Sequence, residues 1–418
     1  MTSGAADDEG RYVSMDAVRG LAVLGILVMN ILGMGMPAYA YEDPTYYGGH
    51  EGADLWTWAV SSVLVEGKMR SLFAMLFGAS ALLIADRATG RPGPLALHYR
   101  RMAWLFVFGL VHAYLLWWGD ILTLYAVAGL FIFPLRKAPP WLLIGLGFVV
   151  LLVFLALNLG DLLDIHTLAN VANAPGADPE TVRLSRETIN ALAAPAEVAT
   201  QQIAGFGGGF VEALRARVAM ALWLQLGPDS LIWILEALGL MLLGMGLFRT
   251  GFFTLGWRAG SYLKMMAAGY LVALPIAAVM TFGIWKSGFE LLTLNLLDAL
   301  QGATWAVIGL AHASALLLLI RSGAAKPVIR LLAAAGRMAL SNYLMSSVIT
   351  TLVFCGFGLG LYGKLSRFEL MGLVAAIWGF ILIWSAPWLA RFHYGPFEWL
   401  WRSLARWKVQ PFRRSSSA

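Results

Sequence analysis

The chain has 418 residues, of which 59% are hydrophobic and 13% charged, and its mean hydropathy is +0.72. A soluble domain carries about a quarter charged residues, so this composition excludes an ordinary soluble protein and predicts an all-α, polytopic bundle of transmembrane helices. The net charge of +6 does not indicate a nucleic-acid-binding protein, because Lys and Arg gather in short loops and in the C-terminal tail. There they are expected to contact membrane lipids.

Runs of apolar residues predict about ten spanning helices, since roughly 20 apolar residues cross a bilayer. In chain order the runs are 17–36, 69–88, 101–118, 120–136, 141–159, 229–248, 262–282, 292–320, 338–356 and 368–390. Residues 1–10 are acidic and lack the basic start of a signal peptide, so the first run is expected to stay as an uncleaved helix.

The distribution of Lys and Arg predicts the orientation of these helices. Basic residues concentrate in alternate loops and in the tail, whereas the loop at 37–53 contains none. Because cytoplasmic loops carry the excess of basic residues, both termini are predicted to lie in the cytoplasm.

Four parts are predicted along the chain. They are an N-terminal membrane half at 1–159, an extracytoplasmic amphipathic segment at 160–228, a C-terminal membrane half at 229–390 and a basic amphipathic cytoplasmic tail at 391–418. Turn-forming residues at 174–179 and glycines at 205–209 interrupt the second part, which predicts surface helices over 180–203 and 211–225. A helix over 396–408 is expected to rest on the inner membrane surface.

Several polar motifs resemble those of one bacterial family. They lie at 16–20 with 24–27 and 30–31, at 67–73 with 76–79, at 109–112 with 118–122, at 336–343 and at 395–402. Together they cover both halves of the chain and resemble the YeiB-like family of uncharacterised bacterial membrane proteins, whose C-terminal half is domain of unknown function 418. This resemblance implies a multi-pass protein of the bacterial cytoplasmic (inner) membrane, and it implies no particular activity.

More remotely, the first helix is similar to that of membrane acyltransferases, including heparan-alpha-glucosaminide N-acetyltransferase and the acyltransferase-3 group. Those enzymes transfer an acyl group from cytoplasmic acyl-CoA to an acceptor on the far side of the membrane. In the acyltransferase-3 group an Arg near the foot of the first helix is followed eleven residues later by a His. Here Arg19 matches, but Asn30 occupies the second position. The similarity implies acyl-CoA as a co-substrate, with no bound cofactor, and requires that another His supply the base.

One cluster of polar residues is expected near the cytoplasmic surface. It comprises Asp16, Arg19, Arg337, Ser341, Asn342 and Tyr343. Asn30 extends the Arg19 face of the first helix about 16 Å further into the bilayer. Guanidinium groups bind phosphate in a bidentate manner, so Arg19 and Arg337, with Asn30 and Asn342, are candidate residues for binding the donor. The alternative is structural, with Arg19 paired to Asp16 and Arg337 reaching lipid phosphate.

A second polar group is expected nearer the outer surface, from Glu66, Lys68, Arg70, His112, Asp120, Glu236 and Asp298. His112 lies near the outer end of the third span and Asp120 follows across a short connection, which predicts a carboxylate-oriented imidazole able to act as a general base. Alternatively, Asp120 only caps the next helix and His112 only satisfies a carbonyl group.

The other members of the outer group permit different roles. Glu66 and Arg70 are four residues apart and are expected to form an ion pair, which locks a bend in the chain or serves a site. Glu236 and Asp298 are candidates to relay protons, to bind a cation, or to pair with Lys68 and Arg70. The sequence predicts no metal site, because it contains no zinc-type cluster; it also lacks a nucleotide-binding loop and a serine nucleophile elbow.

Three functions remain open from the sequence. The first is an acyltransferase that moves an acyl group from acyl-CoA to a lipid- or glycan-linked acceptor, with Arg19 and Arg337 holding the donor and His112 with Asp120 acting on the acceptor. The second is a transporter or lipid translocator that uses the intramembrane carboxylates. The third is a non-catalytic scaffold that binds a partner through 160–228 or the C-terminal helix.

Overall fold

The computed structural model describes residues 12–88, 92–193, 195–227 and 229–414. The acidic stretch at 1–10, on which the prediction of an uncleaved first helix depends, lies outside the described residues. The α-helices are α1 (Val13–Gly35), α2 (Gly52–Leu64), α3 (Lys68–Arg87), α4 (Pro94–Leu115), α5 (Leu122–Ile132), α6 (Pro140–Ala172), α7 (Pro179–Leu192), α8 (Ala196–Gly207), α9 (Phe210–Leu226), α10 (Ser230–Arg249), α11 (Ala259–Ala267), α12 (Leu274–Lys286), α13 (Leu291–Ser322), α14 (Lys326–Arg337), α15 (Ala339–Phe354), α16 (Arg367–Arg391) and α17 (Pro396–Arg406).

Seven helical stretches among the described residues are long and apolar enough to cross a membrane, with α2 and α3 counted as one stretch and α11 to α12 as another. They match seven of the predicted runs. The remaining three runs correspond to α4, α5 and α15, of which α5 has 11 residues, α15 has 16 and α4 carries Arg100 and Arg101 near its start. Helix length and composition therefore identify a membrane-spanning protein, while a count of ten spans stays a prediction.

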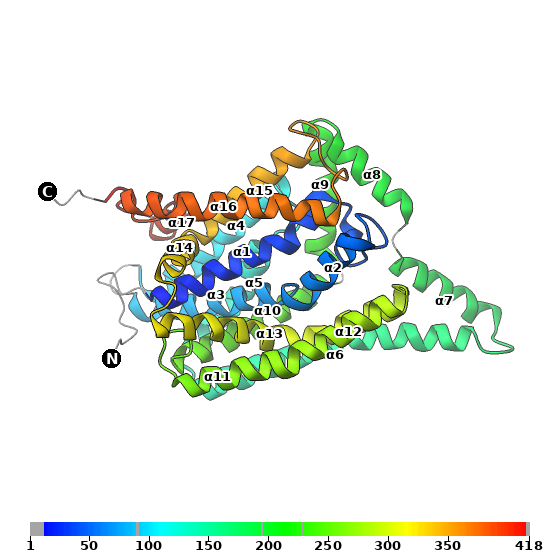
Figure 1. The fold of residues 1–418 in the computed structure, drawn as a ribbon, viewed down its shortest axis with the longest axis horizontal. Helices are drawn as coiled ribbons and strands as arrows, with labels where there is room; N and C mark the ends of the chain where they lie inside the picture. Colours follow the sequence, from blue (N-terminus) through cyan, green and yellow to red (C-terminus); the bar gives the residue numbers. More distant parts are fainter. Residues whose placement is uncertain (1–11, 89–91, 194, 228, 415–418) are drawn as a thin grey trace.

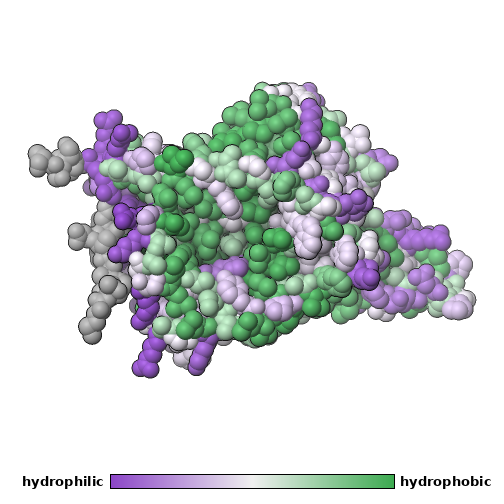
Figure 2. Space-filling model, viewed as in Figure 1, coloured by the Kyte–Doolittle hydropathy of each residue, from purple (hydrophilic) through white to green (hydrophobic). Residues whose placement is uncertain are grey.

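The surface divides into an apolar middle and polar ends (Figure 2). Hydrophobic residues cover the middle of the molecule, and hydrophilic residues gather at its left edge and on the protrusion at the right. α1 begins and α17 ends at the same left-hand end, hereafter the terminal end (Figure 1). An apolar band between two polar ends is the surface that a bilayer requires.

α1 runs through the centre of the bundle, where it contacts α3, α13, α14, α15 and α16 (Figure 1). Its sequence is hydrophobic all round, as expected for a helix with no free face, and Ala17, Val18 and Ile31 are fully buried. The backbones of α1 and α14 touch at Gly20 and Gly336, where a Cβ on Gly336 would lie 1.9 Å from the carbonyl oxygen of Asp16. Only glycine fits this crossing, which brings the foot of α1 against the end of α14.

A helical arm projects from the end opposite the termini and consists of the last part of α6 together with α7 (Figure 1). α6 has 33 residues and does not stop at 159. At about 1.5 Å per residue such a helix is longer than the ~30 Å hydrocarbon core of a bilayer, so part of it extends beyond.

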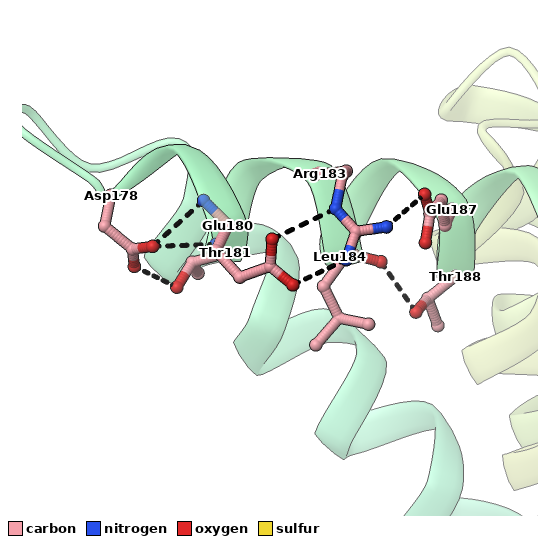
Figure 3. A network of polar contacts seen from close by, with 7 residues as sticks. All are labelled: Asp178, Glu180, Thr181, Arg183, Leu184, Glu187 and Thr188. Carbon is pink, nitrogen blue, oxygen red and sulfur yellow. Dashed lines mark hydrogen bonds and ion pairs between the residues drawn. The ribbon is translucent and has the colours of Figure 1, made fainter.

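Exposed polar contacts stabilise α7 along its length (Figure 3). Asp178 caps its N-terminus by accepting hydrogen bonds from Glu180 N at 3.0 Å and Thr181 N at 3.1 Å, and these bonds and the Thr181 hydroxyl lower the pKa of the Asp178 carboxyl. Arg183 pairs with Glu180 on the turn before it and with Glu187 on the turn after it. All these groups are solvated, so they stabilise a local helix and enclose no site.

Candidate functional site

His112 lies at the centre of a buried chain of hydrogen bonds. It occupies the last turn of α4, and its Nδ1 is 2.8 Å from Asp120 Oδ1, just before α5. Its Nε2 is 2.9 Å from the Oγ of Ser347 in α15. The side chains of His112 and Ser347 are fully buried and Asp120 is 5% exposed. The predicted pairing of His112 with Asp120 is therefore present, and Ser347 extends it.

The second carboxylate oxygen of Asp120 holds the carboxylate in place for its hydrogen bond to His112. Oδ2 accepts hydrogen bonds from Thr123 N at 2.8 Å and from Thr123 Oγ1 at 2.9 Å, which caps α5. Capping and orientation of the imidazole therefore occur together in one residue. If the Asp120 carboxylate accepts from Nδ1–H of His112, Nε2 is free to accept from the Ser347 hydroxyl.

Aromatic rings enclose the imidazole of His112. The Tyr343 ring lies 4.8 Å away and the Trp117 ring 6.3 Å away, centroid to centroid. Tyr343, expected near the cytoplasmic surface, thus belongs with His112. A cavity of about 10 Å³ lies nearby, between Trp117, Thr350 and Arg217, and has room for about one water molecule. A separate hollow of about 430 Å³ is lined by residues that include Thr45, His50 and Trp285, and it contains none of the predicted site residues.

Arg19 is held at the terminal end by three oxygen atoms. Its Nη1 lies 2.7 Å from Asp16 Oδ1 and 3.5 Å from the Gly336 carbonyl, and its Nη2 lies 2.8 Å from Ser80 Oγ in α3. The predicted Arg19–Asp16 pair is present, and the Gly336 contact brings Arg19 close to the start of the 336–343 motif. Arg337 is the last residue of α14, next to that contact.

Further arginines lie around this position. Arg101 of α4 is within electrostatic reach of Arg19, Arg402 and Arg406. Its guanidinium stacks on Trp401 of α17 at 3.8 Å, and the Trp401 indole donates to the Arg101 carbonyl at 2.9 Å. α17 therefore packs on α4 through its apolar face. The result is a group of four arginines at the terminal end, hereafter the arginine cluster.

Asn342 and Asn30 occupy different environments. Asn342 is fully buried, donates to Ala335 O at 2.9 Å and to Ser385 Oγ at 3.2 Å, and accepts from the Trp384 indole at 2.9 Å. These bonds satisfy most of its amide and join α14, α15 and α16. Asn30 is half-buried in α1.

Sequence reasoning missed Glu398 as a structural residue. Its Oε1 accepts from the backbone N–H groups of Leu340 at 2.7 Å and Ser341 at 3.1 Å, which caps α15, and its Oε2 accepts from the Ser341 hydroxyl. The only sequence signal was its position within the 395–402 motif.

Arg70 pairs with Glu236 of α10 at 3.1 Å, and no Glu66–Arg70 ion pair forms among the described residues. The expected i, i+4 geometry is lost because the chain turns at Gly67, which has φ +67° and separates α2 from α3. The guanidinium of Arg70 also stacks on Trp233 and Trp305, at 4.7 and 5.3 Å. Its side chain remains 28% exposed, so the pair is not sealed from solvent.

Lys68 is fully buried beside this pair. Its ammonium donates to Ser62 O at 2.5 Å and to Gln301 Oε1 at 3.3 Å, and Asp298 is half-buried one turn before Gln301. Glu42, in the loop after α1, also faces the group. The side chain of Glu42 is exposed, and it is within electrostatic reach of Asp298 and Arg70. Glu42 and Gln301 carried no recognisable signal in the sequence.

Contacts along α3 and from α5 show where Arg70 lies relative to Arg19 and to the core around His112. Arg70 and Ser80, which binds Arg19, lie on α3 with a separation of about 15 Å along the helix axis. Tyr125 of α5 donates to the Arg70 carbonyl at 3.3 Å and packs in the same core cluster as Tyr343. Tyr125 therefore contacts the main chain of Arg70, and about 15 Å of α3 separates Arg70 from the Ser80 contact of Arg19. No group of three metal-binding side chains occurs in the described part of the chain.

The fold and these polar groups define an integral membrane protein built from helices, with ionisable residues held inside the bundle. Residues 247–408 match the family described as protein of unknown function (DUF418). The chain is 31% identical over 400 residues to a protein of Escherichia coli (strain K12) described as uncharacterized protein YeiB, covering 94% of this chain and 96% of the relative. The chain belongs to this YeiB-like, DUF418 family of membrane proteins.

Two further relatives come from Bacillus species. The chain is 26% identical to the uncharacterized protein YxaH of Bacillus subtilis (strain 168), with 96% of both chains covered. It is 25% identical to an uncharacterized 39.9 kDa protein in the amylase 3' region of Bacillus acidopullulyticus, with 94% of this chain and 93% of the relative covered. No solved structure matches the chain.

Proposed function

We propose that the protein is a membrane acyltransferase that takes an acyl group from cytoplasmic acyl-CoA and delivers it to a hydroxyl of a lipid- or glycan-linked acceptor on the far side. The observation that carries the proposal is the orientation of His112. Asp120 holds the proton on Nδ1, which leaves Nε2 as a base inside an apolar bundle. A base in this state removes a hydroxyl proton as the oxygen attacks a thioester.

The arginine cluster supports a phosphorylated donor. Arg19 lies near the start of α1 and Arg101 stacks on Trp401 of α17. α1 begins and α17 ends at the terminal end (Figure 1), which the basic loops predict to be cytoplasmic. Several guanidinium groups around one position bind the phosphates of a nucleotide better than any neutral ligand. The acyl chain of such a donor would extend along α1 and α3 toward His112.

The test uses purified protein in lipid nanodiscs with radiolabelled acetyl-CoA and extracted membrane lipids and glycolipids as acceptors. His112→Gln is expected to reduce acyl transfer by about 10²- to 10⁴-fold without preventing donor binding. The matched control is His98→Gln, because His98 is a buried histidine on the same helix whose Nε2 contacts the Gly129 carbonyl, at 2.8 Å. Equal activity of the two variants would overturn the role of His112.

Donor binding is tested separately. Arg19→Ala is expected to weaken acetyl-CoA binding, measured by calorimetry, whereas Arg258→Ala, which replaces an exposed arginine at the start of α11, is expected to leave it unchanged. Absence of acetyl-CoA binding by the unaltered protein would refute the proposal.

A second candidate function, a transporter or lipid translocator, is favoured by the Arg70–Glu236 pair. This partly exposed pair joins α3 to α10 between two indoles, next to Lys68 and Asp298. Charged pairs inside a bundle mark ion or proton pathways in many membrane proteins. It predicts pH-dependent flux in proteoliposomes that Asp298→Asn abolishes; flux that is unchanged by this substitution would exclude the pathway.

A further inference from the structure

Two adjacent serines in α15 have different hydrogen-bond environments. Ser346 donates to the Tyr343 carbonyl at 2.7 Å, which is the usual bond of a serine inside a helix. Ser347 lies 3.3 Å from the same carbonyl but 2.9 Å from Nε2 of His112. The shorter contact is with a base whose other nitrogen is oriented by Asp120. Ser347, His112 and Asp120 thus have the arrangement of a nucleophile, a base and an orienting acid.

We propose that Ser347 is the nucleophile that carries the acyl group as a covalent ester between donor and acceptor. This inference rests on the proposed acyl transfer and specifies its route as two displacements. It assigns a catalytic function to a serine that lies 235 residues from His112 in the chain.

The first displacement forms the acyl-enzyme. Ser347 Oγ attacks the thioester carbonyl of the donor while its proton passes to Nε2 of His112, and a C–O bond forms. The carbon–sulfur bond then breaks, and the departing thiolate takes the proton from His112, so the free thiol leaves and His112 is neutral again.

The second displacement reverses the pattern. The acceptor hydroxyl gives its proton to His112 Nε2 and attacks the ester carbonyl, the bond to Ser347 Oγ breaks, and the proton returns to Ser347. The sum is transfer of one acyl group from sulfur to oxygen, with no change in oxidation state and no further reactant.

The cavity near Ser347 and His112 is lined by hydrogen-bond donors that could bind the carbonyl oxygen of the acyl group. Arg217 of α9, which is 1% exposed, and Trp118 both line it, and within the part of the chain that the structure describes neither Arg217 Nε nor Trp118 Nε1 has a hydrogen-bond partner. Arg217 otherwise donates to Leu115 O at 2.9 Å and to Cys355 Sγ at 3.6 Å. A buried cation without a nearby carboxylate is costly, and a negatively charged oxygen in this cavity would offset that cost.

Thr350 connects the cavity to the nucleophile. It lines the cavity and lies one helical turn after Ser347 in α15, where its hydroxyl donates to the carbonyls of Ser346 at 2.9 Å and Ser347 at 3.1 Å. Ser347 is fully buried in this structure, so side chains around it must move to admit the donor. The same burial protects an ester on Ser347 from hydrolysis.

The first experiment tests nucleophilicity without assuming the donor. Protein in nanodiscs is treated with a small fluorophosphonate, and the labelled residue is located by peptide mass spectrometry. We expect labelling at Ser347 that is lost in Ser347→Ala, strongly reduced in His112→Gln and unchanged in Ser346→Ala. Thermal unfolding of each variant confirms that it is folded. An unlabelled Ser347 in the folded protein would overturn the proposal.

The second experiment separates the nucleophile from acyl transfer itself. After incubation with radiolabelled acetyl-CoA alone, the unaltered protein is expected to retain label at Ser347, and Ser347→Cys to retain it as a thioester. If Ser347→Ala transfers acetyl groups to the acceptor at the unaltered rate, the Ser347 proposal fails while acyl transfer stands. If the unaltered protein binds and transfers no acetyl group, acyl transfer fails, and the fluorophosphonate result alone decides whether Ser347 is a nucleophile.

Discussion

Asp120 and Asp178 begin the same four-residue pattern, with a threonine three residues later, and each caps a helix through that threonine. Asp178 is exposed at the start of α7, and both of its oxygens serve the first turn of the helix (Figure 3). Asp120 is buried, and one oxygen serves the turn while the other orients His112. The local pattern therefore determines the cap, and burial next to another helix determines whether the same residue also serves a site.

The largest difference is expected when each aspartate is replaced by asparagine. In Asp120→Asn the new side chain would keep an oxygen for the Thr123 N–H and would turn its amide nitrogen toward His112, which shifts the imidazole proton to Nε2 and removes the base. This substitution should lower acyl transfer by about 10³-fold. Asp178→Asn should leave the rate unchanged, as measured by transfer of radiolabelled acetyl groups. A comparable loss in both variants would contradict the division of roles.

Replacing each aspartate by alanine should affect the stability of the protein differently. Asp120→Ala leaves the buried Nδ1–H of His112 and the Thr123 donors without partners, at a cost of about 3 kcal/mol. Asp178→Ala exposes donors that water satisfies, so its unfolding midpoint should not change. Unfolding in micelles with increasing SDS measures both; equal midpoints would show that the buried chain contributes little to stability.

A smaller effect is expected from removing the two threonine hydroxyls. Thr123→Val removes one buried hydrogen bond to Asp120 and should cost about 1 kcal/mol. Thr181→Val, which removes the equivalent contact at the surface, should have no measurable effect in the same unfolding experiment. A greater cost for Thr181 would mean that α7 has packing partners outside this structure.

The smallest effect is expected when a fall in pH protonates the Asp178 carboxylate and weakens its cap on α7. The folded pKa of Asp178 lies below its unfolded value, so its cap stabilises α7 above the unfolded pKa and is lost as pH falls through the folded pKa. Hydrogen exchange at the Thr181 amide should therefore show reduced protection, relative to the intrinsic rate, at the acidic end of this range. High salt should reduce the contribution of the Arg183 pairs. Unchanged protection across the acidic range would show that packing, and not the cap, holds this turn.

Much of the fold could be predicted because a spanning helix must contain enough apolar residues to cross the hydrocarbon core of the membrane. The predicted runs correspond to helices. α5 and α15 differ because they end early, with 11 and 16 residues, whereas α4 has 22 residues but carries Arg100 and Arg101. The pairing of His112 with Asp120 could also be predicted, since a short connection limits their separation.

Other parts of the site depend on contacts between distant segments. Ser347 lies in a helix where Ser346 and Thr350 are equally polar, so no local signal singles it out. Arg217 was expected on an amphipathic surface helix, but α9 packs its arginine inward against Leu115 and Cys355. The Glu66–Arg70 prediction was wrong because periodicity cannot show that Gly67 interrupts the helix.

The crossing of α1 and α14 at Gly20 and Gly336 has a consequence for motion. Because the two backbones touch there, the distance between the main chains that carry Arg19 and Arg337 does not depend on any side-chain rotamer. The close approach also limits relative motion of the two main chains at this point. A side chain larger than hydrogen at either glycine would push the helices apart and move Arg19 away from Arg337.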